Sequence, residues 1–290
     1  MKYITLFSFY FFAISSAFCQ YPSKQAEFST VNIGGESYSV IKLSNFNKKL
    51  KVKYFAARDQ NNNSVHKRYL GWQTNKNVIC YSSGTYMDNN DINYAKPVGL
   101  CIDQGREVNK GLILDKFDGL VIAYPSGRIA VHSLKSKSIQ IDKGDGKIMN
   151  LNFDSNFDKI QFMNWAKSQE VTVFQTHLFC YKNQIAGSLN NSKKAGRRFL
   201  AAGKDDSGEY KQYIVNLASD NTLQEATRKT VNYLKTYEEL TEIDFLINLD
   251  TGMQDVFGSF TSTGDKVTKK GFQGKLDISN SLNLIVYYVD

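Results

Sequence analysis

The chain has 290 residues, of which 42% are apolar and 22% charged, so it is long enough to bury a large core. Its three prolines and 20 glycines exclude a collagen-like or low-complexity chain. The 17 tyrosines and 19 phenylalanines favour strands, because ring side chains suit half-buried pleated surfaces. The net charge of +8 falls to +7 without Lys2. This positive charge is consistent with an anionic partner but does not identify it.

The first residues have the pattern of a secretory signal. Lys2 precedes an apolar run at 4–18, and the small residues Ala17 and Cys19 predict cleavage of a 1–19 signal peptide before Gln20. A membrane anchor is the alternative, but a spanning helix needs about 20 apolar residues. Acylation of Cys19 is a weaker alternative because Phe18 is bulky. We therefore expect a secreted or periplasmic protein with no stable membrane span after cleavage.

The mature chain keeps three cysteines, Cys80, Cys101 and Cys180. Export permits a Cys80–Cys101 disulfide, while three buried thiols are the preferred alternative. The sequence has no Cys-x-x-Cys, and its three histidines are scattered. We therefore expect no metal site and no other cofactor.

The first half of the chain is read mainly as strands and turns. Segment 20–36 is interpreted as a loose polar leader and 58–68 as a polar loop. Turns are expected at 125–127 and 143–147. Strands are predicted at 37–43, 50–57, 77–82, 120–124 and 129–134, the last two as a hairpin.

The second half adds two helices. Ser155 and Asp158 predict a helix start, with Phe157, Ile160, Met163 and Ala166 on its apolar face. A capping box of Thr222 and Glu225 predicts a second helix, whose apolar face is Leu223, Ala226, Thr230, Leu234 and Tyr237. Strands are predicted at 171–181, 198–203, 210–218, 243–249 and 282–289, and those at 198–203 and 210–218 form a second hairpin around the turn at 204–209.

Strands outnumber helices and do not alternate strictly with them. This pattern favours an α+β fold with a mixed, largely antiparallel sheet packed against a few helices in a single domain. Residues 20–74 are expected to form N-terminal strands and a loop, and residues 75–290 the main domain.

Four polar interruptions lie within or beside apolar strands and are candidate sites, because ligand sites gather on loops at strand ends. Each also has a structural reading: a turn, a hydrogen-bonded buried histidine, a solvated basic surface or an Asx-turn. On a strand, alternation would turn the two adjacent arginines to opposite faces. The candidates are Ser82 and Gly84, Gln175 and His177, Arg197 and Arg198, and Asp250 and Gly252.

In this order the motifs resemble the phosphodiester glycosidase domain family over roughly residues 75–260. The similar segments are SSGTY (82–86), KPVGLCIDQGREV (96–108), YPSGRIAV (124–131), QTHLF (175–179) with a turn at 182–184, the arginine-containing strand pair at 197–215, and LDTGM (249–253). The sequence departs from the family at Ser82, which replaces Asn, and at Thr176 and His177, which replace Ser and Gly. Residues 251–254 replace a Gly-Gly-Gly-Ser loop.

The resemblance implies cleavage of a sugar–phosphate diester. Asp250 would be the catalytic carboxylate facing the sugar, and Arg198, or alternatively Arg197, would hold the phosphate. Substrate-binding roles are implied for Ser82, Gly84, Gln175, His177, Arg197 and Gly252. The alternative is a relative that has lost catalysis and binds an envelope glycan. A nucleic-acid partner is not expected, because no basic, aromatic-interleaved motif accompanies the export signal.

Overall fold

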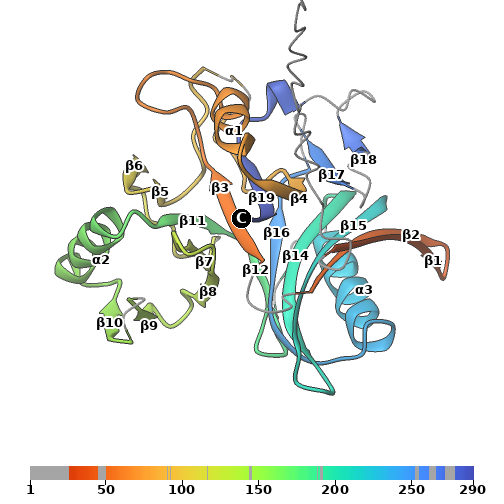
Figure 1. The fold of residues 1–290 in the computed structure, drawn as a ribbon. Helices are drawn as coiled ribbons and strands as arrows, with labels where there is room; N and C mark the ends of the chain where they lie inside the picture. Colours follow the sequence, from red (N-terminus) through yellow and green to blue (C-terminus); the bar gives the residue numbers. More distant parts are fainter. Residues whose placement is uncertain are drawn as a thin grey trace, which may run out of the picture.

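The computed structural model describes residues 26–44, 50–89, 91, 93–115, 117–143, 146–187, 189, 192–251, 255–260, 266–271 and 278–290 (Figure 1). The predicted signal peptide, Gly252 and Met253 lie outside these residues. Within them, no helix is long and apolar enough to cross a membrane.

A seven-stranded sheet forms the centre of the molecule. Its order is β1-β2-β15-β14-β16-β12-β13, and each neighbouring pair is antiparallel. The strands are β1 (Ala26–Ile33), β2 (Glu36–Ser44), β12 (Leu178–Tyr181), β13 (Gln184–Ile185), β14 (Ala195–Asp205), β15 (Tyr210–Asn221) and β16 (Leu240–Leu249).

Helix α3 (Leu223–Thr236) covers one face of this sheet (Figure 1). The Thr222 hydroxyl accepts the Glu225 N–H, and the Glu225 carboxylate accepts the Thr222 N–H, so the predicted capping box is confirmed. Ala226 and Leu234 are buried against odd-numbered β14 residues such as Phe199.

A five-stranded sheet covers the opposite face, in the order β18-β17-β4-β19-β3. The two sheets share a core in which Leu200 and Ile247 of the larger sheet pack with Ile79 and Ile285 of the smaller one. Short helices α1 (Val65–Gln73) and η3 (Ile278–Asn280) adjoin this sheet. Its strands are β3 (Lys51–Phe55), β4 (Asn77–Ser82), β17 (Val256–Phe260), β18 (Lys266–Gly271) and β19 (Leu284–Val289).

A third region lies to the left in Figure 1 and has a core cluster of its own. Its five-stranded sheet has the order β6-β5-β11-β7-β8, beside the β9–β10 hairpin and helix α2 (Asn156–Ser168). The strands are β5 (Cys101–Asp103), β6 (Arg106–Asn109), β7 (Gly119–Ala123), β8 (Ile129–Ser133), β9 (Ser138–Asp142), β10 (Ile148–Asn152) and β11 (Thr172–Thr176).

The strand predicted at 171–181 is two strands in two different sheets. β11 pairs with β5 and β7, whereas β12 pairs with β16. His177 lies at the change, and its carbonyl accepts the backbone N–H of Asn248 at 3.0 Å. The polar interruption in this segment therefore marks where the chain leaves one sheet and enters another.

The expected antiparallel pairing is confirmed in every described ladder, whereas the expectation of one mixed sheet is wrong, because the described strands form several sheets. The fold is mostly sheet with few helices, which matches the predicted α+β class only roughly. The leader expected at 20–36 contains β1, and the loop expected at 58–68 contains the start of α1. Both hairpins predicted around 125–127 and 204–209 are confirmed.

The apolar face predicted for α2 is partly wrong. Phe157 is 73% exposed and Ile160 58% exposed, while Phe162, Trp165 and Ala166 are buried. The N-terminus is confirmed, since the Ser155 hydroxyl accepts the Asp158 N–H at 3.3 Å.

Candidate functional site

The four candidate segments meet where β4 and β16 end and β14 begins. The Asp250 N–H donates to the Gly84 carbonyl at 2.7 Å, which joins the segment after β16 to the segment after β4. Arg198 Nη1 donates to the Ser82 hydroxyl at 3.3 Å, which joins β14 to β4. Residues far apart in sequence thus form one cluster of contacts.

The segment around the sheet change joins the same cluster. The Thr85 hydroxyl donates to the Gln175 carbonyl at 2.7 Å, and the Thr176 hydroxyl donates to the Asn248 carbonyl at 2.8 Å. The Thr251 hydroxyl donates to the Gly196 carbonyl at 2.9 Å. Side-chain hydroxyls therefore fix the strand ends relative to one another.

Arg198 is fully buried and makes a bidentate ion pair with Asp255. Its Nη2 also donates to Asn216 Oδ1 at 3.1 Å, and its guanidinium lies 4.5 Å from the centre of the Phe257 ring. Both terminal nitrogens thus bind protein groups, and Nε has no hydrogen-bond partner within the described residues.

Arg197 points to the other face of β14, as alternation on a strand requires. Its Nε donates to the Asn221 carbonyl at 3.2 Å, and its Nη2 donates to the Lys193 carbonyl at 2.7 Å. It has no carboxylate partner among the described ion pairs, and its charge acts on Tyr86. Arg197 is therefore an arginine without a described carboxylate partner whose charge reaches Tyr86.

Gly84 is required by close packing. A Cβ at this position would lie 2.4 Å from Tyr54 Cε2 and 2.5 Å from Asn283 Oδ1. The same Asn283 oxygen accepts the Gly84 N–H at 2.7 Å. The glycine lets its backbone approach protein groups, which in turn hold the carbonyl that binds Asp250.

Gln175 is fully buried and holds two loops of the third region. Its Oε1 accepts the N–H groups of Leu100 at 2.7 Å and Ile113 at 3.1 Å. Its Nε2 donates to the carbonyls of Ile113 at 2.7 Å and Phe117 at 2.9 Å. The amide is fully used within the protein.

Three polar groups gather at the end of β16: Tyr86, Asn248 and Asp250. Asn248 Nδ2 donates to the Tyr86 hydroxyl oxygen at 2.7 Å, and buried Asn248 Oδ1 has no hydrogen-bond partner among the described residues. Burial raises the pKa of Tyr86 to about 12; the Asp250 charge adds to this rise, and Arg197 and the Asn248 bond oppose it. Tyr86 is therefore a neutral phenol at pH 7.

Aromatic rings lie next to these polar groups. The partly buried His177 ring stacks on Phe117, with centres 4.5 Å apart, and on Phe179 at 5.7 Å. Tyr86 meets His177 edge to face at 5.6 Å and Phe117 at 5.8 Å. Such ring surfaces suit the apolar face of a sugar.

Sequence analysis assigned no role to Tyr86, Asn248, Phe117 or Asp255. Asn248 carried a signal, because it is the polar residue in the apolar run FLINL. Tyr86 ended the SSGTY motif. Phe117 and Asp255 stood out in neither composition nor spacing.

Cys80, Cys101 and Cys180 are buried free thiols, so the Cys80–Cys101 disulfide is absent and the preferred alternative is confirmed. Burial raises the pKa of Cys80 and Cys101, and that of Cys180 to about 11. The described residues contain no group of three His, Cys, Asp or Glu side chains placed to hold a metal ion.

No known protein family matches the sequence. No curated protein matches it either.

Three solved structures have a distantly similar fold. A hypothetical protein from Synechocystis is 11% identical with a TM-score of 0.46; the match covers 91% of this chain and 62% of that one. The zebrafish N-acetylglucosamine-1-phosphodiester alpha-N-acetylglucosaminidase catalytic domain, auto-inhibited by its pro-peptide, is 11% identical with a TM-score of 0.48, covering 92% and 82%. A candidate exported protein of Burkholderia pseudomallei is 9% identical with a TM-score of 0.45, covering 88% and 74%. Similarity at these values identifies no activity for this chain.

Proposed function

We propose that this chain is an exported hydrolase that cleaves a sugar–phosphate diester. The observation that supports the proposal best is the meeting of the four candidate segments around Asp250, with Tyr86 and Asn248 beside it. This arrangement agrees with the resemblance of the motifs to the phosphodiester glycosidase domain. The positive net charge and the aromatic rings suit an anionic sugar ligand.

In the proposed reaction, the bond between the anomeric carbon and the phosphate oxygen breaks. Water adds to that carbon and loses one proton to the solvent, and a phosphate monoester leaves with the bonding electrons. The Asp250 carboxylate stabilises the positive charge that develops on the sugar. Because the phosphate is already a good leaving group, strong general acid catalysis is less necessary.

The neighbouring side chains take different roles. The Tyr86 hydroxyl, which already accepts a hydrogen bond from Asn248, keeps its own proton to donate to a substrate oxygen. Arg197 supplies the positive charge for the phosphate. Arg198 is a positioning residue, because Asp255 already binds both of its terminal nitrogens.

Some of the other predicted substrate-binding residues bind protein groups, and others would contact the substrate. Ser82 and Gln175 hold the protein frame, since their polar groups bind protein partners. His177 takes part in the ring surface that would contact the sugar. Gly252 keeps only its sequence-based role, because it lies outside the described residues.

One observation favours the alternative, a glycan-binding relative without catalysis. Glycoside cleavage generally uses two carboxyl groups, and the second carboxylate near the end of β16, Asp255, is buried in its ion pair with Arg198. With Asp255 held in this ion pair, Asp250 is the one described carboxylate to which the proposal gives a role at the substrate, and such a site would bind a sugar without cleaving it.

The test is to incubate the mature protein with a panel of sugar-1-phosphodiesters and measure the released sugar and phosphate monoester. The proposal expects turnover of at least one diester and none of uncharged glycosides. Binding of the same diesters without turnover would support the alternative.

Arg197→Ala should raise KM for the diester strongly, because it removes the positive charge that holds the phosphate. Equal losses of kcat/KM with charged and uncharged substrates would contradict this role of Arg197.

A further inference from the structure

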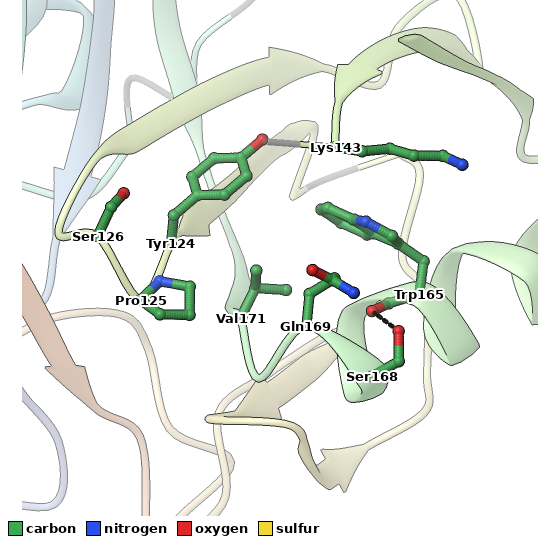
Figure 2. Close-up of a pocket in the computed structure, with 8 residues that line it drawn as sticks. All are labelled: Tyr124, Pro125, Ser126, Lys143, Trp165, Ser168, Gln169 and Val171. Carbon is green, nitrogen blue, oxygen red and sulfur yellow. Dashed lines mark hydrogen bonds between the residues drawn. The ribbon is translucent and has the colours of Figure 1, made fainter. Parts of the chain in front are cut away.

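A cavity of about 510 Å³ lies in the third region of the fold (Figure 2). Its walls come from the turn after β7, from the residue after β9, and from the end of α2 with the loop behind it. This volume falls in the range of small-molecule sites, about 300–1,000 Å³. The lining residues are Tyr124, Pro125, Ser126, Lys143, Trp165, Ser168, Gln169 and Val171.

The cavity is separate from the candidate site around Asp250. On the paired strands β7 and β11, Ala123 faces Thr172 beside the cavity, whereas Gly119 faces Thr176 beside His177. Four residue steps separate the two ends, or about 13 Å along the sheet at roughly 3.3 Å per residue. Neither Asp250 nor Tyr86 lines the cavity.

Two neighbouring aromatic rings that line the cavity are held in fixed positions (Figure 2). Tyr124 and Trp165 lie 6.3 Å apart at an interplanar angle of 67°. The Tyr124 hydroxyl donates to the Asp142 carbonyl at 2.7 Å, and the Arg128 guanidinium covers its ring at 4.2 Å. Trp165 packs on Phe162 at 5.8 Å. The rings therefore form a rigid apolar corner.

The cavity also offers hydrogen-bond donors without protein partners. Trp165 is nine-tenths buried, and its indole Nε1–H has no hydrogen-bond partner among the described residues. A buried N–H of this kind needs an acceptor from a ligand or water. Lys143 lines the same cavity, its side chain runs past Trp165 on the side away from Tyr124 (Figure 2), and its ammonium takes part in no described ion pair. Gln169 presents its amide beside Trp165 (Figure 2).

We propose that this cavity is a second ligand site that takes a pyranose sugar carrying an anionic group. The apolar face of the sugar ring would pack in the Tyr124–Trp165 corner, because ring C–H groups suit aromatic faces. A sugar oxygen would accept the Trp165 N–H, and the anionic group would pair with Lys143. Binding here is independent of hydrolysis at Asp250.

The test follows the indole N–H signals by NMR. The chain has two tryptophans, so Trp165→Phe assigns the two signals while keeping an aromatic ring in the core. The probes are glucuronate, glucose 6-phosphate, neutral glucose and, as an anion without a sugar ring, acetate. We expect at least one of the two anionic sugars to move the Trp165 signal at a several-fold lower concentration than glucose or acetate does, while Trp72 stays unchanged.

Variants complete the test. Lys143→Gln should reduce the affinity for the anionic sugar to that for glucose, and Lys159→Gln on α2, outside the cavity, should leave it unchanged. Asp250→Asn should bind the anionic sugar like the wild type, which separates this proposal from the proposed hydrolysis. An unmoved Trp165 signal with every sugar, equal effects of glucuronate and acetate, or an unchanged preference in Lys143→Gln would overturn it.

Discussion

At the residue scale, Arg198 and Asp255 depend on each other. Both are buried, and Arg198→Ala would leave the Asp255 carboxylate without its main partner. Loss of one member of a buried ion pair costs about 3–5 kcal/mol. We expect urea unfolding to show a loss of this size for Arg198→Ala.

Arg197→Ala is the matched control, because Arg197 on the opposite face of β14 has no carboxylate partner among the described ion pairs. Its loss of stability should be clearly smaller. Equal stability of Arg198→Ala and the wild type would contradict the role of Arg198 as the main partner of the buried Asp255 carboxylate.

Gly84 gives a second residue-scale prediction. Gly84→Ala places a methyl group against Tyr54 and Asn283, and overpacking of this kind costs about 1–3 kcal/mol. The backbone movement that makes room for this methyl group should also disturb the Gly84–Asp250 hydrogen bond and lower activity.

Gly71→Ala in α1 is the control, since nothing lies within 4 Å of its added Cβ. That change should raise the unfolding free energy by about 0.5–1 kcal/mol. Equal effects of the two substitutions would contradict the packing argument.

At the element scale, the positions of the loops at Leu100 and at Ile113 and Phe117 depend on the Gln175 amide. Gln175→Leu removes four hydrogen bonds and leaves loop N–H and carbonyl groups without this partner. Each buried group without a partner costs about 1–3 kcal/mol, so the variant should lose several kcal/mol of unfolding free energy.

Hydrogen exchange should locate this loss. We expect faster exchange at Leu100 and Ile113, whose N–H groups bind Gln175, and unchanged exchange in α3. Unchanged exchange at Leu100 and Ile113 would contradict the role assigned to Gln175.

The elements also show how far the sequence predicts this fold. Strands with apolar runs, such as β4 and β16, and helices with caps, such as α3, were predictable from local patterns. The sequence does not predict β1, because the strand has no fully buried face and therefore no strong apolar pattern. Its residues are only partly buried or exposed. The start of α1 was missed because the helix follows a run of asparagines and has a weak apolar face, and only its Ser64 cap gave a signal.

The candidate site was predictable in its segments and less so in its side chains. Polar residues at the ends of apolar strands indicated 82–86, 175–177, 197–198 and 250, and these segments do meet. Whether a side chain binds protein or faces a ligand depends on partners distant in sequence. Asp255 for Arg198, and the loop carbonyls for Gln175, were not visible in any local pattern.

At the scale of the whole molecule, His132 links stability to pH. Burial, with the charges of Arg128 and Lys182, lowers its pKa from 6.5 to about 4. Between pH 6.5 and about 4 the unfolded chain therefore binds a proton that the folded chain does not. Stability should fall as the pH falls through this window, by on the order of 3 kcal/mol.

Denaturant unfolding at several pH values measures this loss, and His132→Gln is the matched variant. Its slope between pH 6.5 and 4.5 should be clearly smaller than that of the wild type. An identical slope would show that His132 is not the responsible group. Salt-bridged carboxylates such as Glu107, whose pKa is lowered chiefly by Lys167, lose their stabilising charge only at lower pH.

In the proposed function, the fold of the whole molecule positions one carboxylate, Asp250, against a sugar–phosphate diester. The most direct measurement of this claim compares wild type and Asp250→Asn for turnover of the best diester and for urea unfolding. Asn keeps the shape and removes the charge, so turnover should fall by orders of magnitude while the unfolding midpoint barely changes. If Asp250 only ends a turn, Asn replaces it nearly as well. Wild-type turnover by Asp250→Asn would contradict the account.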